Sequence, residues 1–249
     1  MDILKLSELF KEYNIYPLKS YSENTPIRVF QELFPDHYYS KDIEKFLSLH
    51  KYKSLKRGSD LPWWGSDFFQ GSEKNKVMII SQDSLSKDAG SIVFWAHLYD
   101  VINNKDGYEK YTSSLENKKL FIYNNWQKIY NQFLRWNINL DCCYITDASK
   151  VYKNESYKDG DFDIKKSREL LCKEIEICKP NLIILLGRPP LKLLFPKVKY
   201  EDAVENGVCL HFNDSKVVVA PFISGQGLTQ KNYRGRLEIA TNLIKSYIK

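Results

Sequence analysis

The stretch NLIILLGRPPLKLLF, residues 181–195, contains the pattern that decides the fold. Its first part, Asn181–Leu186, is an apolar run without polar alternation, which is typical of a strand covered on both faces in a parallel sheet. Gly187 then supplies a tight turn, and Pro189 and Pro190 suit the first turn of a helix. This strand, turn and helix predict an α/β protein.

Three other short apolar runs have the same character, and helical patterns lie between them. The runs are KVMIIS (76–81), CCYIT (142–146) and KVVVAP (216–221). Because strands alternate with helices, we predict a three-layer α/β/α sandwich around a central, mostly parallel four-stranded sheet with right-handed crossovers. The segment CLHFNDSKVVV favours a hairpin around Asn213–Asp214, which would add an antiparallel edge strand.

Two helices are expected from apolar residues at helical spacing. The first set is Ile164, Leu171, Ile175 and Cys178, and the second is Leu237, Ala240, Ile244 and Ile248. A further helix is expected to carry Trp126, Ile129 and Phe133 on one side. We interpret Trp63 and Trp64 as structural residues.

The chain shows neither an internal repeat nor a low-complexity linker, so a single domain over residues 1–249 is expected. Residues 1–75 are predicted to form a helical N-terminal extension that packs on the sheet. We expect no signal peptide and no membrane span, and therefore a cytoplasmic protein. The five cysteines lack CxxC spacing, which favours reduced thiols. No metal and no cofactor are expected, and the protein is predicted to be a monomer.

The composition favours an anionic partner. The net charge is +6 and aromatic residues make up 14% of the chain. Such a protein can supply both phosphate contacts and stacking surfaces, as nucleic-acid binding requires.

Polar residues follow each predicted strand at its carboxyl end, where α/β sheets bind their ligands. They are Gln82, Asp83 and Ser84 after the first strand, Asp147, Ser149 and Lys150 after the second, Gly187 and Arg188 after the third, and residues 222–236 after the fourth. One edge of the sheet is thus predicted to gather two carboxylates, an amide, glycine-rich backbone and several cations.

These segments resemble the uracil-DNA glycosylase superfamily in the same order along the chain. VMIISQDS (77–84) is similar to the strand and GQDP loop of that superfamily. CYITDASKVY (143–152) and residues 179–195 resemble its middle part, where a strand ends in Thr-Asn. VVVAPFISGQG (217–227) stands in the place of its HPS loop. The resemblance extends from Val77 to the C-terminus.

The resemblance implies a DNA glycosylase, which flips a base out of DNA and cuts its bond to the sugar, leaving an abasic site. It implies that Gln82 binds the base through its main chain. Asp83 would position or activate water and stabilise the cationic sugar. Either Phe94 or Trp95 would stack on the base.

The remaining site residues are also assigned from the resemblance. The loop from Ser224 to Arg236 would contact the DNA backbone and the minor groove. Ser84 and Gly225 are assigned to the substrate, and the DNA contacts are assigned to Lys150, Arg188, Gln226, Lys231, Arg234 and Arg236. The run KNYRGR, residues 231–236, has an ordinary solvated surface as its alternative interpretation.

Asp147 stands where the superfamily commonly has Asn. An Asn side chain offers a donor and an acceptor to uracil, whereas an ionised Asp is only an acceptor. A carboxylate repels uracil O4 but accepts a hydrogen bond from the 4-amino group of cytosine, a difference of about 1–3 kcal/mol. Normal cytosine is excluded because its excision would destroy the genome. We therefore expect a modified cytosine, and defence against phages that carry one fits this substrate.

A second departure concerns the group that stabilises the departing base. Phe222, Ile223 and Ser224 stand in place of the loop histidine. The hydroxyl of Ser224 or the backbone N–H groups of residues 225–227 would serve as an oxyanion clamp. A protonated Asp147 acting as general acid is a further hypothesis.

Several alternatives remain open from the sequence. Asp147, with Ser149 two residues later, suits a turn or cap, and Asp83 suits a helix cap. With Asp147 neutral or turned away, the protein would be a glycosylase for uracil or another deaminated base in repair. The missing loop histidine also permits a nucleic-acid-binding protein that has lost catalysis. A hydrolase of free nucleosides or nucleotides is a weaker alternative.

Overall fold

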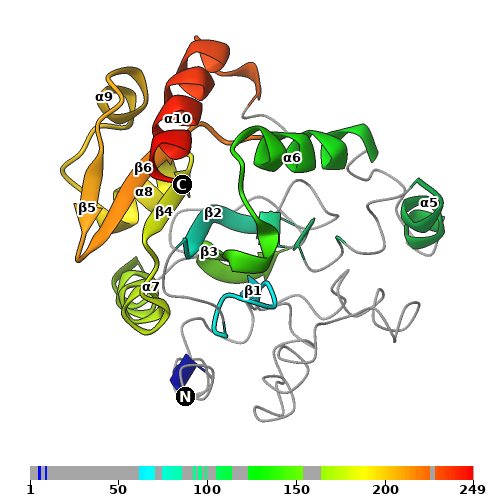
Figure 1. Ribbon diagram of the computed structural model, residues 1–249, viewed down its shortest axis with the longest axis horizontal. Coiled ribbons are helices and arrows are strands. Elements are labelled where there is room, and N and C mark those ends of the chain that lie inside the picture. Colours follow the sequence, from blue (N-terminus) through cyan, green and yellow to red (C-terminus); the bar gives the residue numbers. More distant parts are fainter. Residues whose placement is uncertain are drawn as a thin grey trace.

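A computed structural model of the chain describes residues 5, 6, 9, 62–70, 75–85, 92, 93, 95, 96, 99, 105–113, 123–153, 164–224 and 228–248. In these residues, helices and strands alternate around one sheet (Figure 1). Most of the predicted N-terminal extension lies outside the described residues.

The sheet has six strands in the order β1-β3-β2-β4-β6-β5. Their bounds are Trp63–Trp64 (β1), Val77–Leu85 (β2), Cys143–Lys153 (β3), Leu182–Leu186 (β4), Leu210–Phe212 (β5) and Ser215–Ala220 (β6). The four central strands β3, β2, β4 and β6 are parallel, and β1 and β5 pair antiparallel at the two edges. The α/β class is confirmed, and the sheet contains one short edge strand, β1, beyond the four central strands and the edge strand that were predicted.

The two edge strands have different local causes. The hairpin of β5 and β6 was predicted, and Asn213 in its turn has φ 51°, a left-handed conformation that Asn tolerates well. Strand β1 was not predicted. Trp64 pairs with Tyr144 in the neighbouring strand and stacks on its ring, with the centroids 6.0 Å apart. The indole is 1% exposed, so its structural role is confirmed.

Gly65 holds the chain close to the segment that leads into β3. A Cβ atom on this residue would lie 2.1 Å from the carbonyl oxygen of Leu140. Its N–H donates to the carbonyl of Cys143 over 3.0 Å. Only glycine fits this close backbone approach, which sets the end of β1 against the start of β3.

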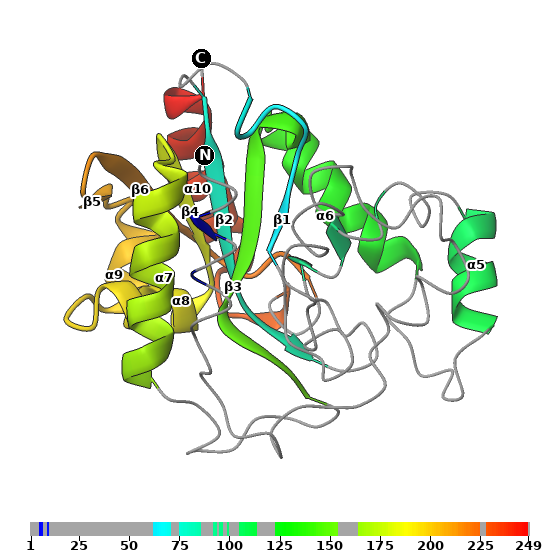
Figure 2. The ribbon, with the colours of Figure 1, turned by 90° about the horizontal axis from the view of Figure 1, so that it is seen from below.

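Helices cover both faces of the sheet. They are α5 (Lys105–Ser113), α6 (Tyr123–Arg135), the 3-10 helix η4 (Leu140–Cys142), α7 (Ile164–Cys178), α8 (Arg188–Leu194), α9 (Tyr200–Glu205) and α10 (Tyr233–Tyr247). One core cluster joins a sheet face to residues of α6 and α10, and the other joins the opposite face to residues of α7, α8 and α9. Seen along the sheet, α7 and α6 lie on opposite sides (Figure 2).

Most of the predicted helical stripes face these cores. Leu171, Ile175 and Cys178 are buried, but Ile164 is 70% exposed. Because Ile164 is the first residue of α7, the buried stripe begins about one turn later, at Ser167. None of the helices in the described part of the chain is long and apolar enough to cross a membrane. The five cysteines are free thiols.

Candidate active site at the carboxyl ends of the strands

Ser81 and Asp147 form a buried pair on neighbouring strands. Ser81 lies in β2 and is the register partner of Asp147 in β3. Both residues are 0% exposed, and the Ser81 hydroxyl donates a hydrogen bond to Asp147 Oδ1. Since β3 continues to Lys153, Asp147 is a strand residue. The alternative that it forms a turn or cap is wrong.

The main chain of Asp83 lies close to this pair. Asp83 is the partner of Ser149, two register positions beyond the pair of Ser81 and Asp147. From the spacing and rise of parallel strands, the Cα atoms of Asp83 and Asp147 are about 8 Å apart. Because Ser84 and Leu85 continue β2 beyond Asp83, the alternative that Asp83 caps a helix is also wrong.

A β-bulge interrupts the pairing next to these residues. Asp83 pairs with Ser149, but Ser84 pairs with Tyr152, so residues 150–151 have no partner in β2. Lys150, a predicted DNA contact, lies in this bulge. Bulges occur often beside active sites, where they redirect side chains. The side chain of Gln82 is exposed, whereas the side chains of Asp83, Ser84 and Lys150 lie outside the description.

Glu174 is a buried acidic residue that the sequence analysis missed. Its Oε1 accepts hydrogen bonds from the hydroxyls of Tyr144 (2.7 Å) and Thr146 (2.9 Å) on β3. Burial, followed by the Glu174 carboxylate, raises the pKa of the Tyr144 phenol well above its ordinary value. A signal was available, because Glu174 stands within the apolar stripe of α7 between Leu171 and Cys178. The contact fixes Thr146, the residue before Asp147.

Strand β4 ends in a turn that exposes a cation. Gly187 has φ +86°, and its N–H donates to the carbonyl of Ala220 over 2.9 Å. Arg188 follows as the first residue of α8. Its guanidinium forms an ion pair with Glu201 of α9 and lies 5.7 Å from the ring centroid of Tyr200. The Arg188 side chain is 54% exposed, so phosphate can reach it.

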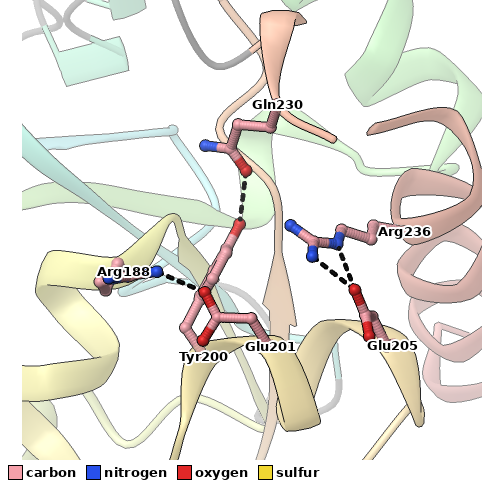
Figure 3. A network of polar contacts seen from close by, with 6 residues as sticks. All are labelled: Arg188, Tyr200, Glu201, Glu205, Gln230 and Arg236. Carbon is pink, nitrogen blue, oxygen red and sulfur yellow. Dashed lines mark hydrogen bonds and ion pairs between the residues drawn. The ribbon is translucent and has the colours of Figure 1, made fainter. Parts of the chain in front are cut away.

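The segment after β6 is buried at Ser224 and is hydrogen-bonded to α9 at Gln230. Ser224 is 0% exposed, and Gly225 and Gln226 lie outside the described residues. Further along, Gln230 accepts a hydrogen bond of 3.2 Å from the Tyr200 hydroxyl (Figure 3). Burial raises the pKa of Tyr200 to about 12, which keeps the phenol protonated as a donor.

The predicted cations of this segment differ in exposure. Lys231 and Arg234 are exposed. Arg236 is buried, and its Nε and Nη2 donate to Glu205 Oε1, the Nε at 3.1 Å (Figure 3). The prediction that Arg236 contacts DNA is therefore corrected. It lies on the inner face of α10, next to the buried Leu237, and joins this helix to α9.

Of the two aromatic candidates for base stacking, Trp95 belongs to the core. It is 2% exposed, and its ring packs edge-on against Phe133 with a centroid distance of 5.2 Å. A ring held in this way has no face available to a base. The other candidate, Phe94, lies outside the described residues. A base-stacking role therefore stays a prediction for Phe94 alone.

Among the residues that the structure describes, no three His, Cys, Asp or Glu side chains are grouped as a metal site requires. His211 is exposed in β5.

A model of the Uracil DNA glycosylase superfamily matches residues 68–238. The match includes β2, β3, β4, β6 and every predicted site residue. The chain therefore belongs to the uracil-DNA glycosylase superfamily, whose members are generally DNA glycosylases, hydrolases that act on DNA. A search of the curated proteins found no match.

Proposed function

We propose that the protein is a monofunctional DNA glycosylase that releases a modified cytosine from DNA and leaves an abasic site. The observation that supports this substrate is the position of Asp147. Its carboxylate is buried within β3, at the position where the superfamily commonly has Asn, and Asp147 is the partner of Ser81 in the adjacent strand.

The proposed specificity follows from the hydrogen-bonding capacity of a carboxylate. An ionised carboxylate has about four acceptor sites and no donor, and the Ser81 hydroxyl occupies one of those sites on Asp147. A base with an exocyclic amine supplies a further donor to this carboxylate, whereas uracil O4 presents another acceptor to it. In a site without water, placing uracil O4 against the carboxylate is unfavourable, because the negative charge of Asp147 gains no donor from the base.

Asp83 is proposed to act on the sugar side of the same base. Its main chain lies on the strand next to Asp147, two register positions further along. Cleavage of an N-glycosidic bond leaves positive charge on the sugar, which a carboxylate stabilises while it orients the attacking water. Two carboxylates in neighbouring strands thus have different roles, one for the sugar and one for the base.

The departing base carries negative charge and needs a donor. We assign this role to the Ser224 hydroxyl or to the N–H groups of Gly225, Gln226 and Gly227. Phe94 is proposed to stack on the flipped base, beside a main-chain contact from Gln82 and a substrate contact from Ser84. Phosphate contacts are proposed for the cations Lys150, Arg188, Lys231 and Arg234, together with Gln226.

One observation favours a second candidate function. Phe222 and Ile223 occupy the place of the loop histidine, and neither side chain can donate a hydrogen bond. A DNA-binding protein of this superfamily that has lost catalysis would tolerate this change. Such a protein would keep its biological effect after Asp83→Asn, whereas a glycosylase would lose it. Defence against phages with modified cytosine is the setting that fits the first candidate.

The experiment that tests the proposal uses duplexes with one cytosine, 5-methylcytosine, 5-hydroxymethylcytosine or uracil at a defined position. Abasic sites are scored by alkaline cleavage, and the released base is identified by mass spectrometry. We expect release of a modified cytosine by the wild type and none by Asp83→Asn. Release of uracil alone would contradict the proposed substrate. No release from any duplex, with DNA binding retained, would favour the second candidate.

A further inference from the structure

We infer that Ser81 is a positioning residue that fixes the Asp147 carboxylate and thereby contributes to the choice of base. This inference rests on the proposed function of Asp147. Ser81 was not among the site residues predicted from the sequence, and it becomes visible only through the register of β2 and β3.

The hydrogen bond between the two side chains has a defined direction. A serine hydroxyl carries one proton, and an ionised carboxylate carries none. The Ser81 O–H therefore donates the hydrogen bond, and Asp147 Oδ1 accepts it. Because both residues are 0% exposed, water does not replace this donor. The bond fixes the rotation of the carboxylate group and keeps its oxygens as acceptors.

Ser81 is well suited to hold another side chain in place. It belongs to β2, which lies between β3 and β4. The preceding residue, Ile80, is paired with Thr146 on one side and with Leu185 on the other. A hydroxyl on such a backbone has little freedom to move, and this makes it a rigid reference for Asp147.

The other face of β3 is held as well. Thr146, the residue before Asp147, donates its hydroxyl to Glu174 of α7 over 2.9 Å. Successive side chains of a strand point to opposite faces. The strand is therefore fixed from the α7 side through Thr146 and from its opposite face through Ser81. Asp147 is held in one orientation before any base arrives.

Two residues that differ from the motifs of the superfamily thus contact each other. In the GQDP motif that SQDS resembles, glycine stands in the place of Ser81, and glycine has no hydroxyl. Asp147 differs from the common Asn. A buried carboxylate requires hydrogen-bond donors, and the serine at position 81 supplies one.

The test compares variants at residue 81 on two probes, duplexes that carry one 5-methylcytosine or 5-hydroxymethylcytosine, whichever the wild type releases, and duplexes that carry one uracil. The measured quantity is the ratio of the single-turnover rates on the two probes. Ser81→Ala is expected to lower the preference for the amine-bearing base roughly tenfold, since the carboxylate loses an orienting donor. Ser81→Thr keeps a hydroxyl and is expected to restore the preference.

Ser215 provides a matched control. Its hydroxyl is also buried and donates a hydrogen bond of 2.6 Å, to the carbonyl of Pro180, but Ser215 lies at the start of β6, away from the carboxyl ends of the strands. Ser215→Ala removes a comparable bond and is expected to leave the ratio unchanged. Ser81→Cys, similar in size with a weak donor, is a second variant if Ser81→Ala does not fold, and its ratio is expected to fall between those of Ser and Ala.

The outcomes separate this inference from the proposed function. A folded Ser81→Ala protein with the wild-type ratio would overturn the positioning role and leave the glycosylase intact. An equal change in Ser215→Ala would also overturn it, since the effect would then reflect general loss of stability. If the wild type releases no base from any probe, the proposed function fails and the inference fails with it.

Discussion

The phenol of Tyr144 and the carboxylate of Glu174 form a buried hydrogen bond of 2.7 Å that joins β3 to α7. Glu174 is 0% exposed, and it also accepts a hydrogen bond from Thr146. An acidic residue at this depth is stable only with donors around it. The two hydroxyls come from the strand that carries Asp147, so the helix and the candidate site are physically coupled.

Tyr144→Phe is expected to lower the free energy of unfolding by about 1–3 kcal/mol near neutral pH, because a buried carboxylate loses a donor. Urea unfolding of the wild type and the variant measures this difference.

The same pair predicts a pH dependence with a definite sign. Because the pKa of Tyr144 is raised in the folded state above its ordinary value of 10.0, the unfolded chain loses this proton first. The wild type therefore loses stability as the pH rises above about 10, and Tyr144→Phe lacks this loss. The difference between the two proteins should shrink between pH 9 and 11. A difference that stays constant over this range would contradict the assignment.

Arg234 and Arg236 are expected to behave differently although both belong to the same basic run. Arg234 is exposed, and Arg236 is buried against Glu205. Arg234→Gln should weaken DNA binding and reduce the slope of log K against log salt by about 0.9, the value for one phosphate contact. Arg236→Gln should lower the melting temperature and leave that slope unchanged. Fluorescence anisotropy over a salt series and thermal unfolding measure the two effects, and a reversed pattern would refute them.

Glu201 is expected to limit the affinity of the protein for DNA, because its ion pair with Arg188 competes with a phosphate for the guanidinium. Glu201→Gln releases the guanidinium for a phosphate and should tighten DNA binding several-fold at low salt. Asp202→Asn is the matched control, because Asp202 is exposed on the same helix and has no ion pair within the described part of the chain. Equal effects of the two substitutions would indicate a general charge effect rather than release of Arg188.

The sequence predicted the α/β class and the four central strands because short apolar runs without polar alternation are typical of strands covered on both faces. It also predicted the hairpin at Asn213–Asp214 from turn chemistry. Strand β1 was missed, since Trp63 and Trp64 are too short a run to show a strand period. Its place depends on tertiary contacts with β3.

The candidate site was predicted less completely for the same physical reason. Both Ser81 and Asp147 are visible in the sequence, but their contact depends on the register between two strands 66 residues apart, which no local pattern encodes. The run KNYRGR does not show which cation faces outward until the start of α10 is known. That start places Arg236 on the buried face with Leu237 and Ala240.

The choice of base by Asp147 is the central claim, and Asp147→Asn tests it most directly. This change replaces an acceptor by an amide with a donor and an acceptor at nearly constant size. Single-turnover rates on duplexes with a modified cytosine or uracil should shift toward uracil by tenfold or more in the variant, in line with about 1–3 kcal/mol for one base contact. An unchanged rate ratio in a folded Asp147→Asn protein would contradict the claim.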